Sequence, residues 1–89
     1  MMIIKDIQDI NTGKTRTDGR YPQRIGCMVE LPGLTQVGQC AYLFYLTDNQ
    51  GYEKDGVLRT SIVTSINWEG EELTIETLNS RYILMKDSK

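Results

Sequence analysis

The segment 58–86 restricts the fold more than any other part of the chain, because it divides into three short runs of strand-forming residues separated by turns. Leu73, Ile75 and Thr77 alternate with charged or polar residues. This period of two is typical of a β-strand with one face in a core and the other in water. We therefore expect a strand here, preceded by a strand at 59–68 that is rich in β-branched residues.

Two turns frame this strand. Gly70 can adopt the positive φ angle of a short hairpin loop. Asn79, followed by Ser80, marks the next turn, because asparagine tolerates the left-handed backbone conformation. A last strand is expected at 81–86, with Tyr82 and Leu84 on one face.

Two segments also fit the spacing of an amphipathic helix. The helical alternative is weakened near the C-terminus by the pair at 79–80, since asparagine and serine disfavour helix interiors. For the N-terminus the isoleucine content favours a strand, although Gly13 could end a helix. The spaced apolar residues are Ile75, Leu78, Tyr82 and Met85 in the first case, and Ile3, Ile4, Ile7 and Ile10 in the second.

Glycines and prolines divide the rest of the chain into pieces too short for ordinary helices. Strand-like runs occupy 24–31 and 39–47, and the second run is almost continuously apolar. Such a run is typical of a strand buried on both faces, in a closed barrel or at an oligomer contact. We predict an all-β fold, a small antiparallel five- to six-stranded barrel of the SH3-like or OB-like kind, formed by 1–89 as a single domain.

Composition excludes several classes of protein. With 89 residues, 39% hydrophobic and 25% charged, the chain is globular, and its modest core makes homo-oligomerisation plausible. The net charge of −2 gives no overall attraction to nucleic acid or anionic lipid. Because the apolar runs are too short for a membrane span and charge interrupts the N-terminus early, we expect a cytoplasmic protein with no membrane partner.

The sequence contains few residues suited to catalysis or metal binding. The chain contains no histidine, and Cys27 and Cys40 lack the spacing of a zinc site. The two cysteines are expected to be free core thiols, with a cross-strand disulfide as the alternative. We therefore predict no enzyme activity, no metal and no cofactor.

Charge is unevenly distributed along the chain. Residues 12–26 carry a net charge of +3 and residues 48–76 a net charge of −5. A glycine-containing basic loop such as 14–24 can hold a phosphate through arginine side chains and backbone N–H groups. The alternative is a solvated loop whose cations balance the acidic half of the molecule or of a neighbouring copy.

Three short motifs support a resemblance. These are Leu-Arg-Thr-Ser-Ile-Val at 58–63, Thr-Leu-Asn-Ser-Arg-Tyr at 77–82, and Arg-Tyr-Pro-Gln-Arg-Ile-Gly at 20–26. With the hairpin between the first two, the pattern resembles small uncharacterised proteins of Firmicutes, related bacteria and their phages. The resemblance implies a compact β-barrel and an intracellular setting, and it implies no activity.

The function expected from the sequence is that of a small non-enzymatic binding module, an adaptor or inhibitor encoded by a bacterium, phage or mobile element. It would act through protein–protein contacts as a homo-oligomer. The alternative is a site for a phosphate-bearing small molecule, such as a nucleotide or cyclic nucleotide, at the basic loop 14–24. The candidate ligand-binding residues are Lys14, Arg16, Arg20, Tyr21, Arg24, Thr60, Ser61, Asn79 and Ser80.

Nucleic acid is not expected as a partner. A barrel could stack bases on exposed aromatic side chains such as Tyr42, Tyr45 or Trp68. Aromatic residues in strands more commonly form a core or an interface, and we favour that role here.

Overall fold

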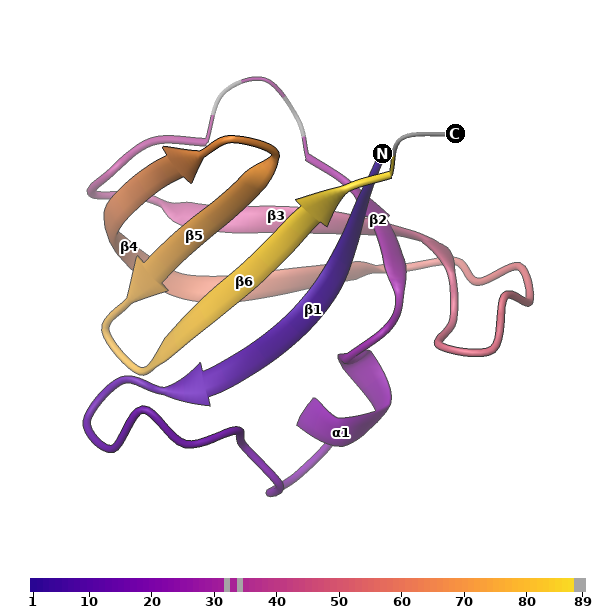
Figure 1. Ribbon diagram of the computed structural model, residues 1–89, viewed down its shortest axis with the longest axis horizontal. Coiled ribbons are helices and arrows are strands. Elements are labelled where there is room, and N and C mark those ends of the chain that lie inside the picture. The colour runs from indigo at the N-terminus through magenta and orange to yellow at the C-terminus, as the bar shows by residue number, and fades with distance from the viewer. Residues whose placement is uncertain (32, 34, 88–89) are drawn as a thin grey trace.

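The computed structural model describes residues 1–31, 33 and 35–87. The chain forms a closed antiparallel barrel in which each strand pairs with the next one in sequence and the last pairs with the first (Figure 1). The predicted small antiparallel barrel is therefore confirmed, with six strands. The elements are β1 (Met2–Asp9), α1 (Tyr21–Arg24), β2 (Met28–Glu30), β3 (Cys40–Thr47), β4 (Val57–Glu69), β5 (Glu72–Thr77) and β6 (Ser80–Lys86).

The barrel has a simple up-and-down strand order. In Figure 1, β5, β6 and β1 lie side by side in front of β3 and β4. The prediction of an SH3-like or OB-like barrel rests on the length of the chain and the number of strands. The order observed here places neighbours in sequence beside each other all the way round.

The C-terminal hairpins form where the sequence predicts them. Gly70 lies between β4 and β5 with a φ of 63°, as expected for the hairpin loop. The left-handed conformation predicted for Asn79 is wrong, because every described residue with a positive φ is a glycine. The Thr77 hydroxyl oxygen forms this turn instead, by accepting hydrogen bonds from the backbone N–H groups of Asn79 (3.3 Å) and Ser80 (3.0 Å).

The inward side chains fill the barrel. On β5, Leu73, Ile75 and Thr77 are all buried, which confirms their predicted common face. On β6, Tyr82 and Leu84 are buried in the same way. The residues between them, Thr74, Glu76 and Ile83, are more exposed, so the period of two holds over both strands.

The N-terminal segment is a strand despite its helical spacing. Ile4 and Ile7 are both fully buried, although residues three apart normally face opposite sides of a strand. The register with β6 shifts between Ile4 and Asp6, which leaves Lys5 as an extra residue in a β-bulge. The bulge returns Ile7 to the inner face and so explains the spacing.

Strand β3 differs from its prediction. Its inward residues Ala41 and Leu43 are buried, whereas the outward residues Tyr42 and Phe44 are 43% and 47% exposed. The prediction that this strand is buried on both faces is therefore wrong within one copy of the chain. The apolar run instead gives this strand one core face and one apolar surface.

The predicted strand at 24–31 is largely wrong, since only Met28–Glu30 is extended. Tyr21–Arg24 forms a turn of helix with Pro22 in its first positions, where the fixed φ of proline is favourable. Gly26 then reverses the chain with a φ of 97° and donates its N–H to the Ile4 carbonyl at 2.7 Å. Within the described residues, no helix is long and apolar enough to cross a membrane.

Candidate functional site: a cationic cleft

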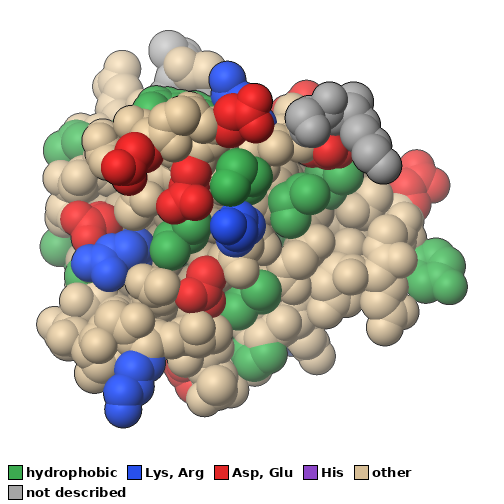
Figure 2. Space-filling model, in the orientation of Figure 1, with side chains coloured by type: hydrophobic (Ala, Val, Ile, Leu, Met, Phe, Trp, Pro, Cys, Tyr) green, Lys and Arg blue, Asp and Glu red, His purple; other side chains and the backbone are tan. Residues whose placement is uncertain are grey.

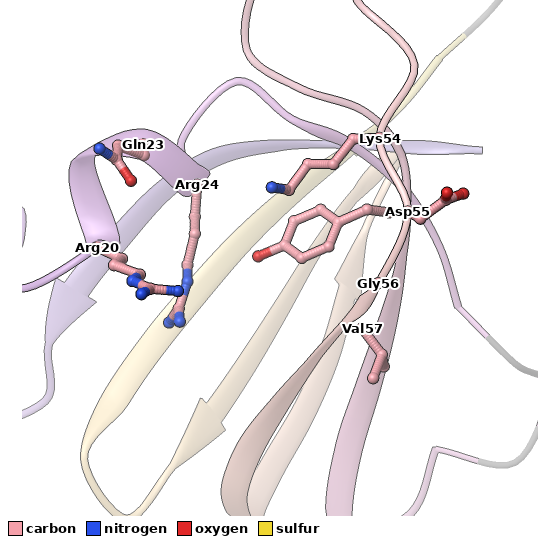
Figure 3. Close-up of a pocket in the computed structure, with 8 residues that line it drawn as sticks. Arg20, Gln23, Arg24, Lys54, Asp55, Gly56 and Val57 are labelled. Carbon is pink, nitrogen blue, oxygen red and sulfur yellow. The ribbon is translucent and has the colours of Figure 1, made fainter.

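A cleft of about 240 Å³ opens between α1 and the connection from β3 to β4 (Figure 3). One wall comes from α1 and the residue before it, and the other comes from the end of β3 and the 48–56 connection. We call it the cationic cleft. It is lined by Arg20, Gln23, Arg24, Tyr45, Lys54, Asp55, Gly56 and Val57.

Its charged side chains are arranged unequally. Figure 3 shows Arg20 and Arg24 on one wall of the cleft, with the ammonium group of Lys54 extending from the opposite wall toward α1. The carboxylate of Asp55 points away from these cations. The interior of the cleft therefore carries positive charge from two separate parts of the chain.

The cations of the cleft are not paired with a carboxylate from the part of the chain that the structure describes. Among the described residues, Arg20, Arg24 and Lys54 have no acidic partner within 4.0 Å. Elsewhere the barrel does pair its charges, as in the contact of 2.8 Å between Arg81 and Glu76. Since like charges in a shared cleft repel, an anion bound between them would be stabilised.

Tyr45 adds a neutral hydrogen-bonding group. Burial raises the pKa of the Tyr45 phenol, although the nearby Arg24 guanidinium acts in the opposite direction. The hydroxyl therefore keeps its proton at neutral pH and can donate it to an acceptor. The Lys54 ammonium lies 5.0 Å from the centre of the Tyr45 ring, which places the cation over the aromatic face.

Both walls of the cleft are fixed by backbone hydrogen bonds. Beyond α1, the Cys27 N–H donates to the Arg24 carbonyl at 3.1 Å. On the other wall, the Asp48 carboxylate accepts the N–H of Tyr52 at 2.9 Å, and the Lys54 N–H donates to the Leu46 carbonyl at 3.1 Å. These contacts order the connection before any ligand binds, which lowers the entropic cost of binding.

The structure divides the predicted site residues into three groups. Arg20 and Arg24 line the cleft. Arg16, Tyr21, Asn79 and Ser80 lie together beside it: Arg16 Nη1 donates to Ser80 Oγ at 2.8 Å and to the Asn79 carbonyl at 3.3 Å. Lys14, Thr60 and Ser61 form the third group, which does not line the cleft.

Arg16 has its own partners within the fold. It pairs with Asp18 at 2.9 Å, and its guanidinium carbon lies 4.3 Å from the centre of the Tyr21 ring. Arg24 approaches the same ring at 5.2 Å. Arg16 therefore links the loop and α1 to the β5–β6 turn, and its position is that of a structural residue next to the cleft.

The third group is occupied by local contacts. Thr60 Oγ1 accepts the Ala41 N–H at 2.9 Å and donates to the Ser61 carbonyl at 2.7 Å. Its side chain is buried, so it serves the pairing of β3 with β4. Lys14 is exposed on the preceding loop, where its carbonyl accepts the Asp9 N–H at 2.8 Å.

Lys54 and Tyr45 also belong to the site, although neither is among the candidate ligand-binding residues predicted from the sequence. Lys54 belongs to the acidic half of the chain, so the regional charge concealed it. For Tyr45 a signal was available, because alternation along β3 places it on the same inward face as Ala41 and Leu43, near the end of the strand. An inward aromatic residue near a strand end is expected at the mouth of a barrel.

A second cleft of about 270 Å³ has a different character. Its lining contains no charged side chain among the described residues, and it consists of Leu31, Gly33, Thr35, Ile66, Trp68 and Leu73. The cationic cleft is the better candidate, since it combines charge with a defined hydrogen-bonding group.

Metal and thiol chemistry do not add to the site. The described part of the chain holds no cluster of three or more potential metal ligands from histidine, cysteine, aspartate or glutamate. Cys27 and Cys40 are free, and burial raises the pKa of the Cys27 thiol. Comparisons with protein-family models, curated proteins and solved structures found no match, so the resemblance described above stays a prediction.

Proposed function

We propose that the protein is a non-enzymatic binding module whose cationic cleft holds the phosphate group of a small molecule. The observation that carries this proposal is the convergence of Arg20, Arg24 and Lys54 in one cleft without a carboxylate partner among the described residues. A phosphate would supply the missing negative charge.

The side chains suit the geometry of a phosphate. Arginine presents a planar set of N–H donors that can bind two phosphate oxygens at once, and lysine adds a compact positive charge. Arg20 and Arg24 approach from one wall and Lys54 from the other, so a phosphate between them would meet donors on two sides. The Tyr45 hydroxyl would add one more donor.

The size of the cleft limits the ligand. Its volume of about 240 Å³ lies below the range of about 300–1,000 Å³ typical of sites that enclose a whole ligand. We therefore expect the phosphate end of a nucleotide or similar molecule to enter, while the rest lies against the rim near Val57.

Binding without turnover is the function that this lining favours. Arginine and lysine side chains attract anions through their positive charge. The one carboxylate of the lining, Asp55, points away from the cations. The lining thus has strong anion-binding groups and lacks a residue placed for general base catalysis.

Titration calorimetry with inorganic pyrophosphate and with nucleotides tests the proposal. We compare Lys54→Met with Lys14→Met, which removes the same charge from an exposed residue outside the cleft. Loss of one charge-assisted contact worth about 1.5–3 kcal/mol should weaken binding by about tenfold or more in Lys54→Met and leave Lys14→Met close to wild type.

Two results would contradict the proposal. One is the absence of binding heat and of any thermal stabilisation of the wild type at millimolar concentrations of every phosphate compound tested. The other is equal weakening by the two lysine variants, which would indicate general charge attraction. The variant Arg20→Gln, Arg24→Gln should lose binding entirely if the cleft is the site.

A further inference from the structure

The outer surface of β3 and β4 carries a continuous group of exposed apolar side chains. We call it the apolar face, and it consists of Tyr42, Phe44, Val57 and Ile62, which are 43%, 47%, 47% and 45% exposed. Phe44 is paired directly with Val57 across the two strands. Contiguous apolar surface of this kind commonly marks a site of protein association.

The opposite side of the barrel is different. Lys5 on β1 lies 3.8 Å from Glu72 on β5, and Arg81 on β6 pairs with Glu76 on β5. Figure 2 shows the side of the molecule on which β5, β6 and β1 lie in front, with acidic and basic side chains intermixed. On this side the partly exposed Ile83 and Met85 lie among charged residues, whereas the apolar side chains of the β3–β4 surface are more exposed.

Two charged residues lie on the same outer surface, one on the neighbouring strand β2 and one on β4 between Val57 and Ile62. Glu30 on β2 is paired with Phe44, and Arg59 on β4 is paired with Tyr42. Among the described residues, neither Glu30 nor Arg59 has an ion-pair partner within 4.0 Å. A surface with an acid on the strand to one side of β3 and a base on the strand to the other side can be complementary to a second copy of itself.

We infer that a second copy of this chain docks on the apolar face, around a two-fold axis that runs roughly along β3. This rotation places β2 of each copy against β4 of the other, so that Glu30 of each copy lies near Arg59 of the other. Along the direction of β3, Glu30 and Arg59 are offset by two residues, or about 7 Å, which long side chains can span.

The contact would also explain the sequence of β3. Its almost continuous apolar run would be buried on both faces, once in the barrel and once between copies. A stable interface buries about 800 Å² per partner, which is a small share of the accessible surface of 5642 Å². The apolar face shares Val57 with the rim of the cationic cleft, but Tyr42, Phe44 and Ile62 lie outside the cleft lining, and the inference does not depend on phosphate binding.

Sedimentation equilibrium over micromolar to millimolar concentrations tests the inference. The wild type should form a dimer, and the double variant Tyr42→Gln, Phe44→Gln should raise the dimer dissociation constant by about tenfold or more. The matched control is Tyr52→Gln, because Tyr52 is 69% exposed on the β3–β4 connection, outside the face. It should leave the dimer unchanged.

A charge exchange identifies the geometry. Glu30→Arg and Arg59→Glu should each weaken the dimer, and the double exchange in one chain should restore it. A monomer of 10.2 kDa at millimolar concentration would overturn the inference. So would a dimer insensitive to the Tyr42 and Phe44 changes, or a double exchange no better than the single ones. Pyrophosphate titration of the same variants keeps the two proposals separate.

Discussion

Replacement of Arg16 by methionine should destabilise the protein far more than an ordinary surface change. Arg16 lies on the loop before α1, and its side chain is only 18% exposed. It joins that loop to the β5–β6 turn through the Ser80 hydroxyl and the Asn79 carbonyl, and it lies over the Tyr21 ring. Arg16→Met keeps much of the side-chain length and removes all of these contacts.

The expected loss is built from the contacts. A hydrogen bond from a charged donor to the buried Ser80 is worth about 1.5–3 kcal/mol. The contact with Tyr21 adds about 0.5–1 kcal/mol. The Asp18 pair adds little, since the Asp18 side chain is 62% exposed. Contacts of one side chain are not additive, so we expect a total loss of about 2–4 kcal/mol.

Urea unfolding at neutral pH measures this loss as a change in the free energy of unfolding, and thermal unfolding should show a decrease in Tm of about 8 °C or more. The matched control is Arg20→Met, because Arg20 lies four positions along the chain and has no ion pair with a described residue. It should change stability by about 0.5 kcal/mol or less. If Arg16→Met matches the control, Arg16 does not hold the loop in place.

Further predictions concern the barrel wall, pH and the thiols. Thr60→Val should lower the free energy of unfolding in urea by about 1–3 kcal/mol, because it leaves the buried Ala41 N–H without its acceptor. Thr60→Ser should retain most of the stability, and equal losses in the two variants would contradict this. Burial raises the pKa of Tyr82 from 10.0 to about 12, so the stability due to its neutral form is complete below about pH 10 and is lost as the pH rises toward 12. The loss of stability due to Tyr82 amounts to about 3 kcal/mol. It should be largely absent in the variant Tyr82→Phe. A free energy of unfolding of the wild type that is constant over this pH range would refute the prediction. Iodoacetamide should label the partly exposed Cys40 in the native protein and leave the buried Cys27 intact, which mass spectrometry of peptides can check; labelling of Cys27 first would show that its burial is wrong.

The C-terminal half of the barrel could be predicted from the sequence because its signals are local. Alternation at Leu73 and Ile75 reports which face is buried, and Gly70 supplies a turn whose left-handed conformation favours glycine. The conformation of Asn79 could not be predicted in the same way. The turn has two solutions, and the hydroxyl of Thr77 selects the one without a left-handed residue.

The other differences between the predicted and the observed elements arise from contacts between residues that are far apart in the sequence. The bulge at Lys5 appears only when β1 pairs with β6, so the isoleucine spacing alone looked as helical as extended. At Tyr21–Arg24, the residues on either side of the turn are held by contacts with β1. A four-residue helix has too little local signal to be recognised against a strand-like composition.

The two arginines of the candidate site could be predicted as well. The basic loop identified Arg20 and Arg24, because charge density is visible in a window of sequence. Lys54 could not be found in that way, since it joins the arginines only after the β3–β4 connection folds back beside α1. Predicting the cleft would require knowing which barrel end each connection occupies.

An amide NMR titration with pyrophosphate tests the phosphate-binding proposal most directly. We expect saturable shift changes concentrated at residues 20–24 and 54–57, with a much smaller response at the exposed Lys14 and at the β5–β6 turn. Shift changes spread evenly over the basic residues of the barrel, or none at 54–57 under saturating pyrophosphate, would contradict a phosphate site between α1 and the β3–β4 connection.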